Sequence, residues 1–418
     1  MESFRLDEYE KSQSLFFTSS VTTLTLYKYM QSTDPETFLR KRFLEIVQRN
    51  PWIMGRIVRR NGNLYCEFDP YPQTLRYDCF HCVHDTNLDK TSLSDPDYLK
   101  HTSTFIDKYN VKYSKDCIDN NGPLCTLTIV KNDITGCFYF SFSCCHLIID
   151  GKTYYLLYSM FDFRTQPYSL IFDRFAFKSV LKELNFTETS DNFFMYLSRI
   201  IGIIRNSFFR VERVWTLGNI NSEWILSQKK LMESSQLSTN DILSFFFFLK
   251  GGEIKENTNC MVVNFRNKIQ SITDLHAGNY AFPVAYEKSE YYPDNIKKSV
   301  SFIKYYATTK LNMFSILYGN IVLVTNWSSI YSSVGIPCCE LIYHMPILSK
   351  NILKPFKLYV CIFNNGSGLS VITSSCTDIN FYPAVSPLFQ TKICTHFGSV
   401  LQLFSVIRRH ICRLFYTI

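Results

Sequence analysis

Residues 141 to 151 read SFSCCHLIIDG, and this stretch decides the expected fold. A β-rich apolar run carries one histidine, His146, to its end, and Asp150 then begins a turn into the helical pattern of residues 153–161. A histidine beside a turn at a strand end can be held rigidly and still reach a cleft, which suits a general base. A single histidine near an apolar strand is more often structural, so the rest of the chain must decide between the two roles.

The sequence on either side alternates a helical pattern with strand patterns. Residues 36–50 space their apolar side chains as a helix does, and Pro51 ends the pattern. Residues 52–68 and 124–144 each hold two apolar-rich runs split by a turn sequence, which is typical of a hairpin. This alternation predicts mixed α/β architecture, with mixed sheets and flanking helices. Further strands are predicted at 261–265, 321–325, 356–363 and 368–374, and a capped helix at 242–250.

The strand pattern lapses between about residues 164 and 214, which marks a connection between two halves. We therefore expect an N-terminal half at 1–165, a connecting segment at 166–214 and a C-terminal half at 215–418. Thr395 is a candidate N-cap for a final helix that would extend to about Tyr416.

Composition and charge narrow the class of protein. The chain has 418 residues, 46% of them hydrophobic and only 19% charged, which fits a globular protein rather than a disordered one. Its formal net charge of +8 comes from scattered basic residues, and no nucleic-acid-binding module is recognisable, so no nucleic-acid partner is expected. The apolar runs are too short for a membrane-spanning helix, and the first residues do not resemble a signal peptide. We expect a cytoplasmic monomer.

Residues 79–84 read CFHCVH and gather side chains that can bind metal. A structural zinc site normally draws two separated ligand pairs, whereas an extended strand would point Cys79 and Cys82 to opposite faces. The alternation therefore predicts a half-buried strand at this point and no metal site.

The pattern His146-x-x-x-Asp150-Gly151 resembles the HxxxDG motif of the chloramphenicol acetyltransferase-like superfamily, which includes BAHD acyltransferases, alcohol acyltransferases and the condensation domains of nonribosomal peptide synthetases. Other segments resemble further family motifs and occur in the family's order. They are Asn50-Pro51-Trp52 with Gly55-Arg56, Ser238-Thr239-Asn240-Asp241, Asn264-Phe265-Arg266 with Gly278-Asn279-Tyr280, and Val324-Thr325-Asn326-Trp327. The resemblance covers most of the chain and implies two similar α/β halves that face each other across a channel.

The resemblance also implies an activity, that of an acyltransferase for groups other than amino-acyl groups (EC 2.3.1). His146 would deprotonate a hydroxyl or amine acceptor, which then attacks an acyl-CoA thioester. Acyl-CoA would be a co-substrate, and no permanently bound cofactor is expected. Asp150 would pair with Arg266 and, with Gly151, support the histidine loop. Thr325 and Asn326 would contact the substrate or the developing oxyanion.

Two departures from the family pattern keep alternatives open. Cys145 stands where many condensation domains have a second histidine, which favours a BAHD-like or alcohol acyltransferase. Residues 332–339, SSVGIPCC, stand where BAHD enzymes have DFGWG and keep one glycine only. The alternatives are a wax-ester or condensation-type transferase with a long-chain or carrier-bound donor, and a non-catalytic relative that binds a ligand.

Residues 199–213 would form an amphipathic helix in the connecting segment. Such a stripe most often packs on the core. The alternative is that its apolar side lines the channel mouth or makes weak peripheral contact with an anionic internal membrane. The apolar side would hold Ile200, Ile201, Ile204, Phe208 and Val211, with Arg199, Arg210 and Arg213 opposite.

Overall fold

The structure is a computed structural model. It describes residues 1–7, 10, 19–31, 34–85, 108–111, 113–174, 213–232, 237–252, 258–268, 271–286, 292–301, 321–348, 356–376 and 388–397. In the first half the elements are β1 (Glu2–Arg5), β2 (Val21–Tyr29), α2 (Pro35–Arg49), the 3-10 turn η1 (Pro51–Met54), β3 (Arg56–Arg60), β4 (Asn63–Phe68), β5 (Phe80–His84), the 3-10 turn η3 (Ser114–Cys117), β6 (Cys125–Asn132), β7 (Cys137–Cys144) and α4 (Gly151–Ser159). In the second half they are β8 (Arg213–Ile220), α7 (Ser222–Leu231), α8 (Thr239–Gly252), β9 (Thr258–Asn264), β10 (Ala281–Tyr286), α9 (Pro293–Ser301), β11 (Ile321–Asn326), β12 (Cys339–Pro346), β13 (Leu358–Asn364), β14 (Leu369–Cys376) and β15 (Phe389–Phe397).

Local sequence signals explain where several elements begin and turn. The Asp34 side chain accepts from the backbone N–H of Glu36 and caps α2. The β3–β4 hairpin turns at Asn61 and Gly62, whose φ angles of 48° and 76° are left-handed. At the start of α8, Ser238 and Asp241 exchange side-chain-to-backbone hydrogen bonds, which is a capping box.

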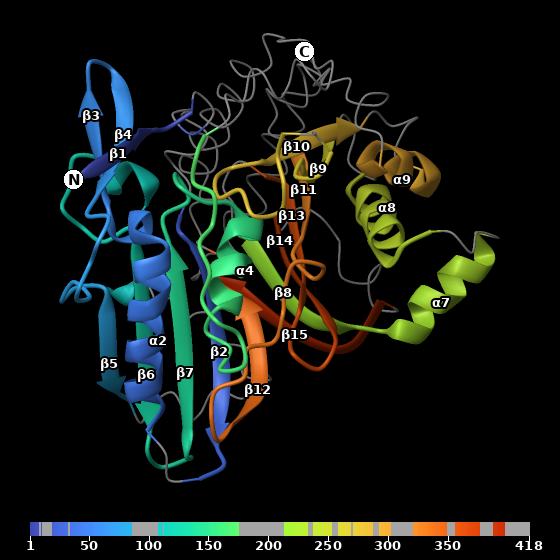
Figure 1. Ribbon diagram of the computed structural model, residues 1–418. Helices are drawn as coiled ribbons and strands as arrows, with labels where there is room; N and C mark the ends of the chain where they lie inside the picture. Colours follow the sequence, from blue (N-terminus) through green and yellow to red (C-terminus); the bar gives the residue numbers. More distant parts are fainter. Residues whose placement is uncertain are drawn as a thin grey trace, which may run out of the picture.

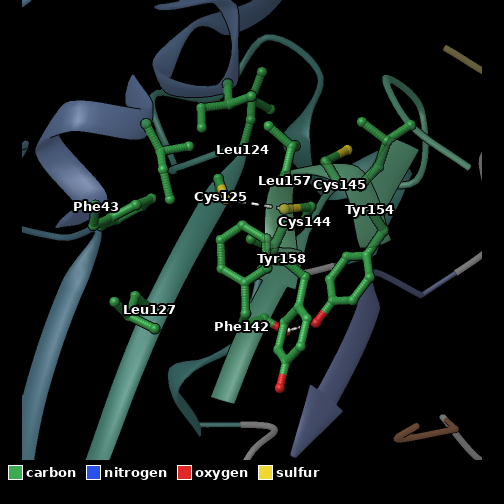
Figure 2. Packing of buried hydrophobic residues seen from close by; sticks show 14 of the residues in the cluster. Phe43, Leu124, Cys125, Leu127, Phe142, Cys144, Cys145, Tyr154, Leu157 and Tyr158 are labelled. Atoms are coloured by element: carbon green, nitrogen blue, oxygen red, sulfur yellow. Dashed lines mark hydrogen bonds between the residues drawn. The ribbon is translucent and has the colours of Figure 1, made fainter. Parts of the chain in front are cut away.

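The first-half sheet has the strand order β12-β2-β7-β6-β5. β12 comes from the second half of the chain and pairs antiparallel with β2, so the two halves share a sheet (Figure 1). Helices α2 and α4 cover the same face of this sheet, because Phe43 of α2 and Tyr154 of α4 both pack on Phe142 of β7, with ring centroids 6.2 and 5.3 Å apart. Figure 2 shows part of this buried cluster.

The second-half sheet has the order β10-β9-β11-β13-β14-β8-β15. β11 runs parallel to its neighbours β9 and β13, and the other pairs are antiparallel. Helices α7, α8 and α9 lie beside this sheet (Figure 1). α8 approaches β11 so closely that a Cβ on Gly251 would lie 2.4 Å from a methyl group of Val322. A separate three-stranded sheet has the order β1-β4-β3.

A buried apolar cluster joins the two larger sheets. It includes Leu24 of β2 and Tyr139 of β7 from the first sheet, and Leu217 of β8 and Cys361 of β13 from the second. Burial of apolar area contributes about 25 cal/mol per Å², so this shared core stabilises the arrangement of the halves.

The predicted mixed α/β class is confirmed, as are both hairpins and the strand at residues 80–84. The predicted C-terminal helix start is wrong, because Thr395 lies within β15 and pairs with Trp215 of β8. Residues after 397, the amphipathic stripe before Arg213 and most of the connecting segment lie outside the described residues, and the two boundaries between the three expected segments stay predictions. No helix among the described residues is long and apolar enough to cross a membrane.

Candidate active site

His146 lies in the loop that joins β7 to α4. The residues around it, Cys145 and Leu147, are fully buried, whereas His146 is half-buried. Its Nδ1 atom is buried and has no hydrogen-bond partner among the described residues. Burial lowers the pKa of His146 below the ordinary 6.5, and the Asp150 charge opposes this shift without cancelling it. The ring is therefore neutral near pH 7 and able to accept a proton.

Asp150 fixes the far end of the same loop. Its carboxylate accepts from the backbone N–H of Thr153 at 2.9 Å, which caps α4, and from that of Tyr280 at 2.9 Å. Arg266 donates to both carboxylate oxygens, Nη1 to Oδ2 at 2.7 Å and Nη2 to Oδ1 at 3.1 Å. The bidentate ion pair expected from the sequence is therefore present.

The ion pair is buried and fully hydrogen-bonded. The side chains of Arg266 and Asp150 are 0% and 3% exposed. Burial acts to raise the pKa of Asp150, but the Arg266 charge and the hydrogen bonds outweigh it and hold the pKa below the ordinary 3.8. Arg266 also donates to the hydroxyl of Thr153 at 2.8 Å and to the carbonyls of His276 at 2.9 Å and Gly278 at 3.1 Å. Arg266 thus ties the His146 loop to the second half of the chain.

The end of β11 reaches the start of α4 through Trp327. A Cβ on Gly151 would lie 3.5 Å from Trp327 Nε1, which is van der Waals contact, so the indole packs directly on the first residue of α4. Trp327 Nε1 donates to the Thr325 hydroxyl at 3.1 Å. Thr325 therefore belongs to the same neighbourhood as the histidine loop.

Asn326 is engaged differently from Thr325. Its Nδ2 donates to Asn240 at 2.8 Å, and its Oδ1 accepts from the Ser328 hydroxyl at 2.7 Å and the Ser328 backbone N–H at 2.9 Å. These bonds join the end of β11 to the first turn of α8. The Asn326 amide thus connects β11 to α8.

Residues 332–339 pack at the other end of α4. Gly335 N–H donates to Asp162 at 2.8 Å, and its carbonyl accepts from Phe163 N–H at 3.0 Å. The Tyr27 hydroxyl donates to the carbonyl of Val334 at 2.8 Å. The single glycine kept from the family pattern thus lies in a packed structural contact.

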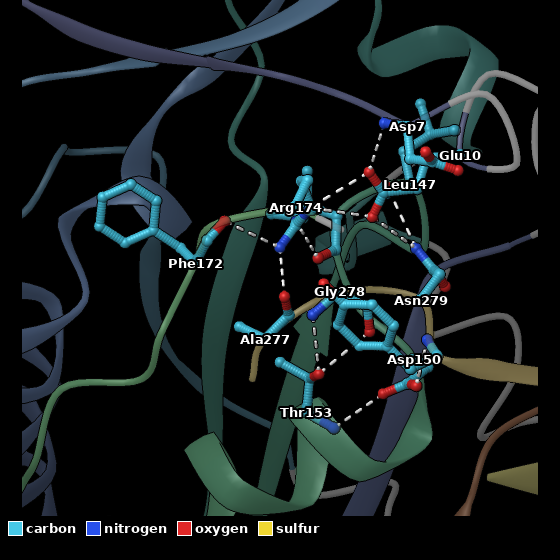
Figure 3. Close-up of polar contacts among 12 residues, drawn as sticks. Asp7, Glu10, Leu147, Asp150, Thr153, Phe172, Arg174, Ala277, Gly278 and Asn279 are labelled. Atoms are coloured by element: carbon cyan, nitrogen blue, oxygen red, sulfur yellow. Dashed lines mark hydrogen bonds and ion pairs between the residues drawn. The ribbon is translucent and has the colours of Figure 1, made fainter. Parts of the chain in front are cut away.

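Sequence reasoning missed two charged residues beside the histidine loop, Glu10 and Arg174. Both side chains are buried, and Arg174 donates to the carbonyl of Ile148 at 2.8 Å (Figure 3). Neither residue stands in a recognisable motif: Arg174 contacts the loop through its backbone, and Glu10 contacts Arg174. No sequence signal pointed to them.

The residues with metal-binding chemistry do not gather into a site in the part of the chain that the structure describes. Among those residues, no group of three or more His, Cys, Asp or Glu side chains could hold a metal ion. Cys79 is buried and Cys82 is half-buried along the β5 edge, in line with the strand interpretation.

No protein-family model matches the chain, and no curated protein matches it in sequence. Its structure is similar to that of F. graminearum TRI101 complexed with coenzyme A and deoxynivalenol, with a TM-score of 0.61 and 9% identity over 90% of this chain and 96% of that one. It is similar to vinorine synthase, with a TM-score of 0.62 and 11% identity over 93% and 94%. It is also similar to polyketide synthase associated protein 5 from Mycobacterium tuberculosis, with a TM-score of 0.58 and 11% identity over 91% and 95%.

These three proteins have the chloramphenicol acetyltransferase-like fold. The present chain has the same fold over nearly its whole length, which confirms the fold expected from its sequence. At 9–12% identity the likeness establishes the fold and leaves the activity to the site.

Proposed function

We propose that the chain is an acyltransferase that moves an acyl group from an acyl-CoA thioester to a hydroxyl or amine acceptor, with His146 as the general base. The observation that carries the proposal is the position of His146. Its half-buried ring, with a lowered pKa, lies on a loop that the buried Asp150–Arg266 pair fixes from the other half of the chain. A neutral and rigidly held imidazole is what general-base catalysis requires.

In the proposed reaction, His146 takes a proton from the acceptor and later gives it to the leaving thiolate. The reachable ring nitrogen is Nε2, because Nδ1 is buried. Nε2 takes the proton of the acceptor hydroxyl or amine as the acceptor oxygen or nitrogen attacks the thioester carbonyl carbon. The tetrahedral intermediate then collapses, the carbon–sulfur bond breaks, and the imidazolium returns its proton to the departing thiolate. The products are the ester or amide and free coenzyme A.

Thr325 is the proposed donor to the oxyanion of the tetrahedral intermediate. Its hydroxyl accepts from Trp327 Nε1 and keeps its own hydrogen to donate. Asn326 is the weaker candidate of the two, because its amide is engaged with Asn240 and Ser328. A preorganised donor of this kind contributes to transition-state stabilisation.

The structures similar to this chain support a coenzyme A donor and a small-molecule acceptor. TRI101 was crystallised with coenzyme A together with deoxynivalenol or T-2 mycotoxin. For this chain, the acceptor would enter a channel between the halves. The cytoplasmic location and the lack of a nucleic-acid partner stay predictions. So does the monomeric state, which gel filtration tests, and so does weak peripheral membrane contact, which vesicle co-sedimentation tests.

The test is acyl transfer by the purified protein. Release of free coenzyme A thiol is followed with short- and long-chain acyl-CoA donors, and with a carrier-bound donor, against a panel of alcohols and amines. His146→Ala should lower turnover by about a hundredfold or more with the fold intact, because general-base catalysis contributes roughly 10²–10⁴ in rate.

The matched control is His84→Ala. Register places His84 beside Lys131, and Lys131 beside Phe138 at the start of β7, so His84 lies at the opposite end of the sheet from the His146 loop. This variant should keep wild-type turnover. Near-normal turnover in His146→Ala would sink the mechanism, and activity with the carrier-bound donor alone would favour the condensation-type alternative. No turnover of any donor, with ligand binding retained, would favour the non-catalytic relative.

A further inference from the structure

Three successive carbonyl groups of the histidine loop are held by side chains from elsewhere in the chain. Asn279 Nδ2 donates to the carbonyls of His146 at 3.0 Å and Leu147 at 3.1 Å. Arg174 Nη2 donates to the carbonyl of Ile148 at 2.8 Å. Figure 3 shows Arg174 and Asn279 beside Leu147 of the loop. The three peptide planes that follow His146 are therefore fixed from outside the loop.

The guanidinium group of Arg174 is buried, and each of its three nitrogens has a hydrogen-bond partner. Its side chain is 6% exposed, and its Nε lies 3.1 Å from the carboxylate of Glu10, whose own side chain is 2% exposed. Its Nη1 donates to the carbonyl of Ala277, in the segment that also supplies Asn279. One guanidinium thus bridges the N-terminal segment, the histidine loop and the second half of the chain.

Glu10 forms an ion pair with this guanidinium group. Its Oε2 accepts from the backbone N–H of Asp7 at 3.0 Å, and its Oε1 lies 3.4 Å from Asn279 Nδ2. Burial raises the pKa of Glu10 above the ordinary 4.5, and the Arg174 charge only partly opposes this. The buried carboxylate is therefore costly, and apolar residues of similar volume often stabilise such a position more.

We propose that Glu10, Arg174 and Asn279 form a loop clamp whose purpose is to orient His146 toward its substrate. The clamp is distinct from the Asp150–Arg266 pair: the pair holds the side chain at the end of the loop, and the clamp holds the backbone at and after His146. The proposal rests on the proposed function of His146. All three are positioning residues, because they act through His146.

The physical basis is the sensitivity of catalysis to small displacements. A shift of about 1 Å in a catalytic group can lower the rate by roughly 10²-fold. The peptide plane that follows His146 helps to set the direction of its Cα–Cβ bond, so releasing the carbonyls of His146 and the next two residues lets the ring move. Release would also expose the ring to water and weaken the burial that lowers its pKa.

The test uses Arg174→Lys in the full chain. Lysine keeps the positive charge beside Glu10 but lacks the planar fork, so it cannot also hold Ile148 and Ala277. We expect kcat to fall by roughly ten- to a hundredfold with little change in KM for the acyl-CoA. The midpoint of the His146 titration, followed by NMR with His146→Ala used for assignment, should rise toward 6.5. Glu10→Gln should change both quantities in the same direction.

Arg42→Lys is the matched control. Arg42 is also buried and also donates to a backbone carbonyl, that of Thr165 at 2.6 Å, but it lies on α2 and does not touch the loop. It should keep wild-type kcat and the wild-type His146 titration.

An unchanged His146 titration and unchanged kcat in both Arg174→Lys and Glu10→Gln would overturn the clamp. Effects equal to those of Arg42→Lys would overturn it too. If Arg174→Lys does not fold, Glu10→Gln and Asn279→Ala decide by the same two readouts. Full activity in His146→Ala would refute the proposed function instead, and the NMR titration would still decide whether the clamp positions the ring.

Discussion

The Asp150 side chain caps a helix and also joins two distant parts of the chain. Its carboxylate caps α4, accepts from Tyr280 and pairs with Arg266, so all its oxygen sites are used by groups from three places in the chain. Removing one partner of such a pair leaves a buried charge uncompensated, which costs more than the pair itself contributes.

Arg266→Ala should therefore destabilise the protein by about 3–5 kcal/mol, because it leaves Asp150 buried and unpaired. Urea unfolding at pH 7 measures the loss. Arg40→Ala is the control: Arg40 pairs with Glu36 at 3.0 Å on the exposed side of α2, with side chains 52% and 26% exposed, and should cost less than about 1 kcal/mol. Equal losses in the two variants would show that the pair is not a structural tie.

The sequence predicted the residues of the site unevenly. His146, Asp150 and Arg266 stand in recognisable patterns of residue types, and the side chains of Asp150 and Arg266 contact each other. Glu10 and Arg174 could not be found in this way, because Arg174 donates to backbone carbonyls that any residue type presents and Glu10 acts through Arg174.

At the scale of elements, β12 is the clearest case of a strand specified from far away. It pairs with β2, about 300 residues earlier, and its His344 is fully buried. The ring nitrogens lie 2.9 Å from the Thr25 hydroxyl and 3.1 Å from the Tyr155 hydroxyl of α4, and the ring stacks on Tyr331. β12 is thus fastened to both the sheet and the helix that begins at the site.

The burial of His344 predicts how the free energy of unfolding depends on pH. Burial lowers its pKa from 6.5 to about 3, so the unfolded chain binds a proton more readily than the folded one between these values. Its contribution to stability is present above pH 6.5 and is lost as pH falls toward 3, by at most about 1.4 kcal/mol per pH unit. His344→Asn should flatten the fall in unfolding free energy between pH 6 and 4.5.

Chemical denaturation of wild type and His344→Asn at several pH values checks this slope, and His84→Asn controls for loss of a histidine on the exposed end of β5. Parallel pH curves for wild type and His344→Asn would contradict the buried, neutral state of the ring.

Elements with local signals were the predictable ones. The β3–β4 hairpin follows from Asn61-Gly62, and α8 follows from its capping box. Thr395 was misread as the cap of a C-terminal helix because threonine is a plausible N-cap, whereas it lies in β15, which pairs with β8 across some 180 residues. Long-range pairing overrides local propensity, and it leaves little trace in a short window of sequence.

At the scale of the whole molecule, the halves are joined by three kinds of contact around the site. β12 crosses into the first sheet, an apolar cluster is shared between the sheets, and the Asp150–Arg266 pair ties the histidine loop to the second half. Residues from both parts of the chain thus contact the His146 loop.

The central claim is that a neutral His146 is the base for acyl transfer, and the pH dependence of kcat/KM for the acyl-CoA tests it most directly. Because burial holds the pKa of His146 below 6.5, the wild-type rate should fall at acid pH as the ring gains a proton, with the midpoint of this fall below pH 6.5. His146→Ala should lose this acidic limb together with about a hundredfold or more of the rate. A midpoint at or above 6.5, or an acidic limb that survives in His146→Ala, would contradict the account.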